Sequence, residues 1–196
     1  MVNKLLNDLI RENRGEITCA NSFGSIIWAI VVEFRKFHNN EINLTKRDHS
    51  ALSSTLNKVI RIFTDDKPEF VSKNVANLIF NINPKIDPFD VVKNSRTKTF
   101  GANKVIYEHI IPVKQLISQL MLEVKNVNDV CNFLSTYPGT ALITVEEDKC
   151  LNQAGGRTQR ANWEEFYQGC NIELLSEEDF KQYMKELTQN QKGVGG

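Results

Sequence analysis

Apolar and polar residues alternate with the period of an α-helix through the first part of the chain. Apolar side chains recur three and four positions apart, so that each segment presents one apolar face. This spacing predicts four helices, over residues 3–13, 22–37, 45–63 and 68–82. The second is apolar enough to be the central helix of a bundle. The pattern therefore indicates a helical amino-terminal lobe.

The character of the chain changes between Pro84 and Ala102. Two prolines, a glycine and a basic stretch interrupt the helical period here, and such residues are typical of turns and loops. We therefore predict a boundary between a first lobe at residues 1–95 and a second lobe at residues 96–196.

Two short apolar runs in the second lobe predict a pair of strands. Residues 104–109 include a β-branched and aromatic run, and residues 141–144 follow the turn signal Pro138-Gly139. Helical periods surround these strands, at residues 113–124, 127–134, 145–154 and from 176 onward. The expected fold class is mainly α with a small β-hairpin.

Composition and charge restrict the partners, the location and the cysteine chemistry that we expect for the chain. The 24 basic and 24 acidic residues give a formal charge of zero, so nucleic-acid binding would need a local basic patch. The longest apolar run, residues 26–32, is too short to cross a bilayer, and charged residues interrupt any signal peptide near the amino terminus. We expect a cytoplasmic protein without membrane contact. The four cysteines form no C-x-x-C pair and are expected to be reduced, mostly structural thiols.

Glu108 and His109 bring a carboxylate and an imidazole together at the end of an apolar strand. Neighbouring strand residues point to opposite faces, so the two would act together only where the strand ends or distorts, as Pro112 favours. Farther along the chain, Asp148 and Asn152 lie one turn apart on the same helix face. If the two predicted strands pair, the start of this helix approaches Glu108 and His109.

Such a cluster has the composition of a Mg²⁺ or Mn²⁺ site. Oxygen atoms of Glu108, Asp148 and Asn152 would hold the cation. Neutral His109 would act as general base on a water molecule, while the metal polarises the scissile phosphate. The combination predicts metal-dependent hydrolysis of a nucleic-acid phosphodiester.

The segment from Tyr107 to Pro112 resembles the D/E-H-x-x-P signature of the HNH, or ββα-metal, nucleases. A later segment, residues 142–155 followed by Trp163 and residues 169–172, resembles the second half of some phage and bacterial HNH-like proteins. In that family the first carboxylate binds the metal and the histidine activates the attacking water. The resemblance implies a ββα-metal-like carboxy-terminal lobe that acts on nucleic acid, and it does not extend to residues 1–95. We expect the partner to be DNA rather than RNA.

The sequence departs from the family pattern in three respects. It has no cysteine knuckle, it has Asp148 where many members have histidine or asparagine, and a long helical stretch separates the two strands. Asn128 or Asn132 could supply the middle asparagine, and the sequence does not choose between them. These departures leave the ligand set in doubt.

Five basic residues in the second lobe could contact phosphates, namely Arg96, Lys98, Lys104, Arg157 and Arg160. The amino-terminal lobe would then supply target recognition or a homodimer surface. Two other functions stay open. One is a catalytically inactive nuclease-like factor that binds nucleic acid or protein in phage or host defence. The other is a helical interaction module in which Glu108 and His109 are structural.

Overall fold

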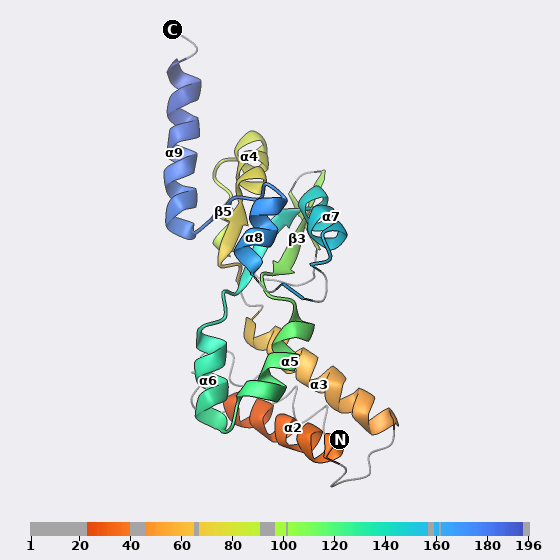
Figure 1. The fold of residues 1–196 in the computed structure, drawn as a ribbon. Coiled ribbons are helices and arrows are strands. Elements are labelled where there is room, and N and C mark those ends of the chain that lie inside the picture. Colours follow the sequence, from red (N-terminus) through yellow and green to blue (C-terminus); the bar gives the residue numbers. More distant parts are fainter. Residues whose placement is uncertain are drawn as a thin grey trace. The chain divides into compact units, whose positions relative to one another are not determined.

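The computed structural model describes residues 23–39, 46–64, 67–90, 97–100, 102–156, 159–160 and 162–193 (Figure 1). The chain divides into two compact units. The first comprises Met1–Ile60 and Ile117–Tyr137, and the second comprises Arg61–Leu116 and Pro138–Gly196. The units therefore do not follow the predicted boundary near residue 95, because each of them is built from two stretches of chain. The predicted helix at residues 3–13 lies outside the described residues.

The first unit is helical. It contains α2 (Phe23–His38) and α6 (Val127–Ser135), which pack against each other, while α3 (Lys46–Thr64) and α5 (Val113–Glu123) contribute residues to both units. All four helices lie where the sequence predicts them. The described part of this unit buries apolar side chains from each helix, among them Ile27, Val31, Phe34, Leu56, Val59, Ile60, Leu120, Val130 and Leu134.

Arg35 joins two helices within the first unit. Its guanidinium donates hydrogen bonds to the carbonyl oxygen of Met121, at 3.0 Å from Nε and 2.7 Å from Nη2, and to that of Leu120 at 3.3 Å. These carbonyls belong to the last turn of α5, where carbonyl oxygens have no N–H donors within their own helix. The same guanidinium lies 5.6 Å from the ring centroid of Trp28. Arg35 thus caps α5 from α2.

The second unit is built on a five-stranded sheet, which is larger than the predicted hairpin. The strand order is β2-β3-β4-β1-β5, and only β1 and β4 are parallel among these pairs. The strands are β1 (Phe70–Ser72), β2 (Thr97–Phe100), β3 (Asn103–His109), β4 (Thr140–Thr144) and β5 (Leu174–Leu175). The class of a mainly helical protein with some β-structure is confirmed, whereas the single hairpin is not.

The predicted pairing of residues 104–109 with residues 141–144 is confirmed. β3 and β4 are antiparallel, with Val105 opposite Thr144 and His109 opposite Thr140. β1 was expected to be the first turn of a helix starting at Pro68. It joins the second unit because Phe70 lies beside Ala141 of β4, and residues 61–95 as a whole belong to that unit.

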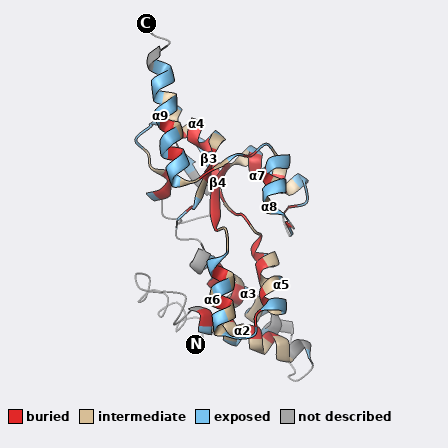
Figure 2. Cartoon of the chain, turned by 60° about the vertical axis from the view of Figure 1, so that its left-hand side comes forward, coloured by how far each residue is buried: buried red, intermediate tan, exposed pale blue. Residues whose placement is uncertain are grey.

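Helices cover both faces of the sheet (Figure 2). On one face, α4 (Lys73–Ile82) and α9 (Glu177–Gly193) bury Val71, Val105, Tyr107 and Leu142. On the other face lie α7 (Val145–Gln153) and α8 (Trp163–Gly169), which pack over a cluster that includes Ile106, Ala141, Ile143 and Leu151. The 3₁₀ turn η1 (Pro88–Asp90) completes the described elements.

Side-chain caps fix the starts of α4 and α7. Ser72 accepts a hydrogen bond from the amide of Val75 at the start of α4, and Thr144 forms a capping box with Glu147 at the start of α7. The last helix was expected from residue 176 and begins at Glu177. In the described part of the chain, no helix combines the length and the apolar character needed to span a bilayer.

Candidate functional site

Glu108 and His109 point to opposite faces of the sheet. β3 remains a regular strand through His109, whose partner is Thr140, and successive side chains of a strand alternate between its faces. The predicted distortion is not present, because the amide of Ile110 still donates to the carbonyl oxygen of Gly139 at 3.2 Å. His109 therefore lies on the face of Tyr107, with 6% of its surface exposed, and is not beside the Glu108 carboxylate.

Arg160 supplies the positive charge next to Glu108. Its Nη2 atom lies 2.5 Å from Oε1 of Glu108, and its Nη1 atom donates to the carbonyl oxygens of His109 and Ile110 at 2.8 Å each. The side chain of Arg160 is 0% exposed and that of Glu108 is 14% exposed. A guanidinium thus occupies the position in which a metal ion was predicted.

Several features of the chain allow Arg160 to be buried. Its amide donates to Oε1 of Gln115 at 2.6 Å, and Nε2 of Gln115 donates to the carbonyl oxygen of Arg160 at 3.0 Å. Gly156 leaves room for the side chain, since a Cβ atom at Gly156 would lie 2.9 Å from Nε of Arg160. The guanidinium carbon is 5.6 Å from the ring centroid of Tyr167. Burial raises the pKa of the Tyr167 hydroxyl, and the charge of Arg160 offsets part of this increase.

The start of α7 lies at the far end of the strand pair from His109. Because β3 and β4 are antiparallel, Thr144 is opposite Val105 rather than opposite the end of β3. The expectation that the helix start approaches Glu108 and His109 is therefore wrong. Instead Leu151, near the end of α7, packs in the same cluster as Ile110.

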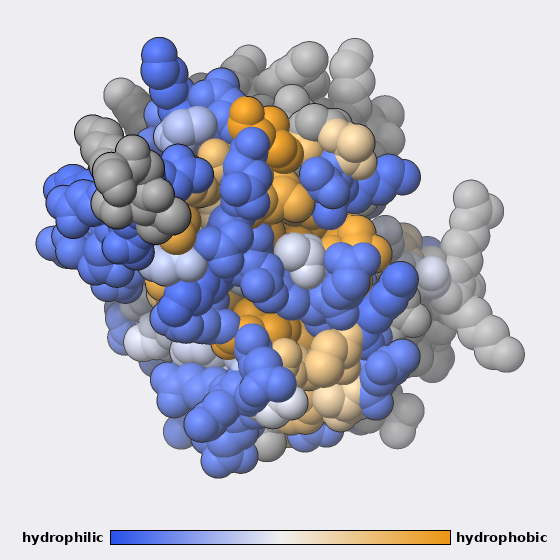
Figure 3. All heavy atoms as spheres, turned by 90° about the horizontal axis from the view of Figure 1, so that it is seen from above, coloured by the Kyte–Doolittle hydropathy of each residue, from blue (hydrophilic) through white to orange (hydrophobic). Residues whose placement is uncertain are grey.

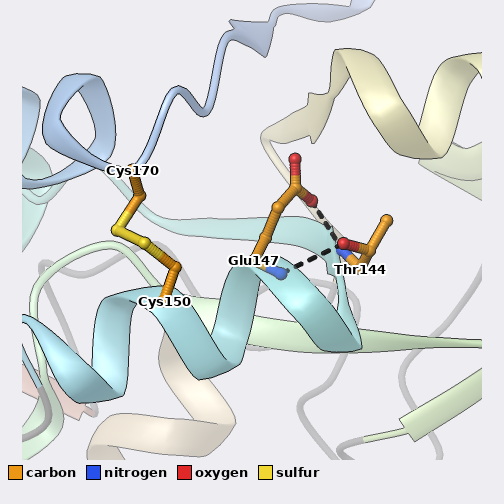
Figure 4. Close-up of a disulfide and its surroundings, with 4 residues drawn as sticks. All are labelled: Thr144, Glu147, Cys150 and Cys170. Carbon is orange, nitrogen blue, oxygen red and sulfur yellow. Dashed lines mark hydrogen bonds between the residues drawn. A yellow bond between two sulfur atoms is a disulfide. The ribbon is translucent and has the colours of Figure 1, made fainter.

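The acidic residues of α7 have separate roles. Asp148 and Asn152 share a helix face as predicted, and Nδ2 of Asn152 donates to Oδ2 of Asp148 at 3.1 Å. Glu147 is 6% exposed. Its carboxylate accepts hydrogen bonds from Oγ of Ser72 at 2.7 Å and from Nδ2 of Asn74 at 2.9 Å. It also accepts a hydrogen bond from the amide of Thr144 at 2.7 Å (Figure 4). Sequence reasoning missed this link between the starts of α4 and α7.

The described arrangement does not fit a divalent cation at Glu108. The guanidinium of Arg160 already lies against the carboxylate, and a cation there would have to displace it. Within the described ranges, no three or more histidine, cysteine, aspartate or glutamate side chains are grouped to hold a metal ion. Glu108 of the predicted ligand set is paired with Arg160, and Asp148 and Asn152 are hydrogen-bonded to each other on α7, so the set of Glu108, Asp148 and Asn152 stays a prediction.

The five residues predicted to contact phosphates differ in their location and exposure. Lys104 is exposed, and Lys98 belongs to β2. Arg96 and Arg157 lie outside the described residues. Arg160 was expected on a polar surface loop and is instead buried. The two alternatives for the middle asparagine, Asn128 and Asn132, are exposed on α6 of the first unit.

Two of the four cysteines form a disulfide, contrary to the expectation of reduced thiols. Cys150 in α7 is bonded to Cys170, the residue that follows α8, with Cα atoms 5.9 Å apart (Figure 4). Cys131 is not disulfide-bonded to any described residue, and Cys19 lies outside the described residues. The separation of 20 residues matches no motif, so only the packing of α7 and α8 on one face of the sheet brings the two sulfur atoms together.

No protein-family model, curated protein or solved structure matches this chain.

Proposed function

We propose that the chain is a non-catalytic binding protein in which the second unit keeps a nuclease-like order of strands and helix. The pairing of Glu108 with the buried guanidinium of Arg160 supports this proposal. Removing one partner of a buried ion pair leaves an uncompensated charge. Glu108 is therefore better suited to hold the end of β3 than to bind and release a catalytic metal.

The position of His109 favours the same conclusion. A general base must come within hydrogen-bond reach of the water that it activates. The imidazole of His109 is buried on the face of the sheet opposite Glu108 and α7. A structural role for Glu108 and His109 is the interpretation that this geometry favours.

A protein partner is favoured over nucleic acid. The formal charge of zero provides no long-range attraction to a polyanion, and burial removes Arg160 from the predicted phosphate contacts. Leu122 of α5 is 83% exposed and offers an apolar contact of the kind found at protein interfaces. A cytoplasmic location and a homodimer formed by the amino-terminal part stay predictions.

An HNH-type endonuclease is the second candidate. The antiparallel pair β3 and β4 is followed directly by α7, which covers the face that carries Glu108. This is the order of elements that the HNH resemblance implies. In this candidate Arg160 would have to leave Glu108 before Mg²⁺ or Mn²⁺ could bind.

A plasmid-cleavage assay separates the two candidates. Wild type, His109→Ala and the control Glu164→Ala, which changes an exposed residue of α8, would be incubated with supercoiled DNA and Mg²⁺ or Mn²⁺. We expect no metal-dependent nicking by any of them. Nicking by wild type and by Glu164→Ala that is absent from a folded His109→Ala variant would reject the proposal and establish the endonuclease.

A further inference from the structure

The Cys150–Cys170 disulfide closes the segment that carries Arg160. Cys150 lies in the last part of α7, and Cys170 directly follows α8. Between them lie the end of α7, Gly156, Arg160 and the whole of α8. The bond thus connects the two helices that cover the Glu108 face of the sheet (Figure 4).

Within this closed segment, Arg160 makes the hydrogen bonds that join the α7–α8 connection to β3 and α5. Its guanidinium contacts Glu108 and the carbonyl oxygens of His109 and Ile110, and its backbone exchanges two hydrogen bonds with Gln115. The described remainder of the connection bonds mainly within the last turn of α7, where Gly156 donates to the carbonyl oxygen of Leu151. The position of this connection therefore depends on the disulfide and on Arg160.

α8 is connected both to Arg160 and to the disulfide. Tyr167 of α8 packs beside the guanidinium of Arg160, and Cys170 caps the end of that helix with its amide bonded to the carbonyl oxygens of Phe166 and Tyr167. When the crosslink is present, α8 is held close to α7 and Tyr167 is held against Arg160. Reduction of the disulfide restores conformational freedom to the segment between Cys150 and Cys170.

We propose that Cys150 and Cys170 form a reversible redox switch that sets how firmly Arg160 holds the end of β3. Both cysteines are only partly buried, so a dithiol can reach them. A thiolate of the dithiol attacks one cysteine sulfur, which forms a mixed disulfide and releases the other cysteine as a thiolate. The second thiol of the reagent then displaces the remaining cysteine. The products are two cysteine thiols and the oxidised dithiol.

A reversible disulfide is also compatible with the expected cytoplasmic location. Disulfides in reducing compartments are usually transient, catalytic or redox-sensing. A cytoplasmic location and a Cys150–Cys170 bond are therefore compatible if the bond forms and breaks in response to the cellular dithiol pool. This inference holds for either candidate function, because it concerns the support of Arg160 and not the partner.

Hydrogen exchange followed by mass spectrometry tests the switch directly. The intact protein would be labelled before and after reduction with dithiothreitol, and the amides of Arg160 and Ile110 would be compared with those of Leu142 and Ile143 in β4. We expect exchange at Arg160 and Ile110 to become at least about ten times faster on reduction. The Arg160 amide bonds to Gln115 from within this segment, and the Ile110 amide, which bonds to Gly139, lies at the end of β3 that Arg160 holds. The β4 amides should change by less than about twofold.

Variants separate this crosslink from other thiols. Cys150→Ser should show the fast exchange of the reduced protein with and without dithiothreitol. Cys131→Ser, which changes the cysteine of α6 that is not disulfide-bonded to any described residue, should respond as wild type does. Three outcomes would overturn the proposal. They are an air-oxidised protein that yields no Cys150–Cys170 peptide, a reduced wild type with unchanged exchange at Arg160, and an equal acceleration in β4, which would indicate general unfolding.

Discussion

A guanidinium in a protein interior loses its hydration, so it is stable there only when protein oxygens replace the lost water. Arg160 meets this condition at Nη1 and Nη2 through one carboxylate oxygen and two carbonyl oxygens, whereas its Nε has no hydrogen-bond partner among the described residues. The planar fork of arginine suits such an arrangement, since its donors point in fixed and different directions. The charge of Arg160 and the acceptors at the end of β3 are therefore mutually dependent.

Replacing Arg160 by methionine should destabilise the second unit. Arg160→Met removes the hydrogen bonds that the guanidinium donates to the largely buried Glu108 carboxylate and to two carbonyl oxygens. We expect the free energy of unfolding to fall by about 3 kcal/mol. Arg160→Lys should recover only part of this loss because an ammonium group cannot reproduce the fork. The control Lys149→Met changes an exposed residue and should stay within about 0.5 kcal/mol of wild type.

Urea unfolding of these variants and of Glu108→Leu would measure the coupling. The double variant Arg160→Met with Glu108→Leu should lose less stability than the sum of the two single changes, because it removes both charges together. Additive losses would show that the pair does not hold the end of β3.

The sequence pointed to Glu108, His109 and Arg160 but could not predict what they do. Arg160 was interpreted as a surface charge because nothing near it in the chain supplies acceptors. Its partners lie 45 to 52 residues away, at Gln115 and at the end of β3. Burial of a charged residue is thus a property of tertiary contacts and leaves no local pattern.

At the scale of elements, the start of one helix is tied to the start of another. Glu147 caps α7 through Thr144 and also accepts from Ser72 and Asn74 at the start of α4. The capping box could be predicted from the spacing of Thr144 and Glu147. The second set of bonds could not, because Ser72 lies 75 residues from Glu147.

Glu147→Ala should therefore lower the stability of the protein by more than the loss of a single helix cap would. We expect the free energy of unfolding to fall by about 3 kcal/mol, since the buried hydroxyl of Ser72, the side-chain amide of Asn74 and the backbone amide of Thr144 all lose a charged acceptor. Urea denaturation would measure this change, with Glu146→Ala as the matched control because Glu146 is the exposed neighbour in the same helical turn. Similar losses in both variants would mean that Glu147 acts only on α7.

The two shortest strands are too short for the spacing of apolar residues to distinguish a strand from a helix. β1 has three residues and β5 has two, and a pattern of that length fits a helix turn equally well. β3 and β4 are longer and lie where the sequence predicts them. β1 becomes a strand only because β4 and β5 flank it, with Val71 beside Leu142 and Leu175.

Over the whole molecule, equal numbers of acidic and basic residues leave the surface mixed. Hydrophilic residues surround and interrupt the apolar ones on the face seen in Figure 3. The change in composition near residue 95 suggested two lobes, but contiguous sequence could not reveal units that each use two stretches of chain. Their assembly depends on pairings such as β1 with β4, which are distant in sequence.

Because the formal charge is zero, no net electrostatic field attracts a polyanion. We therefore expect wild type to show no saturable binding of a short DNA or RNA duplex, even at low salt. A matched variant tests whether charge alone is the missing factor. Glu123→Lys with Glu186→Lys changes two exposed residues and raises the formal charge from zero by two for each change, to +4. Fluorescence anisotropy should show weak binding by this variant, and added salt should abolish it. Saturable binding by wild type that Lys104→Glu removes would instead show that the strand hairpin carries a local basic site and that nucleic acid is a partner.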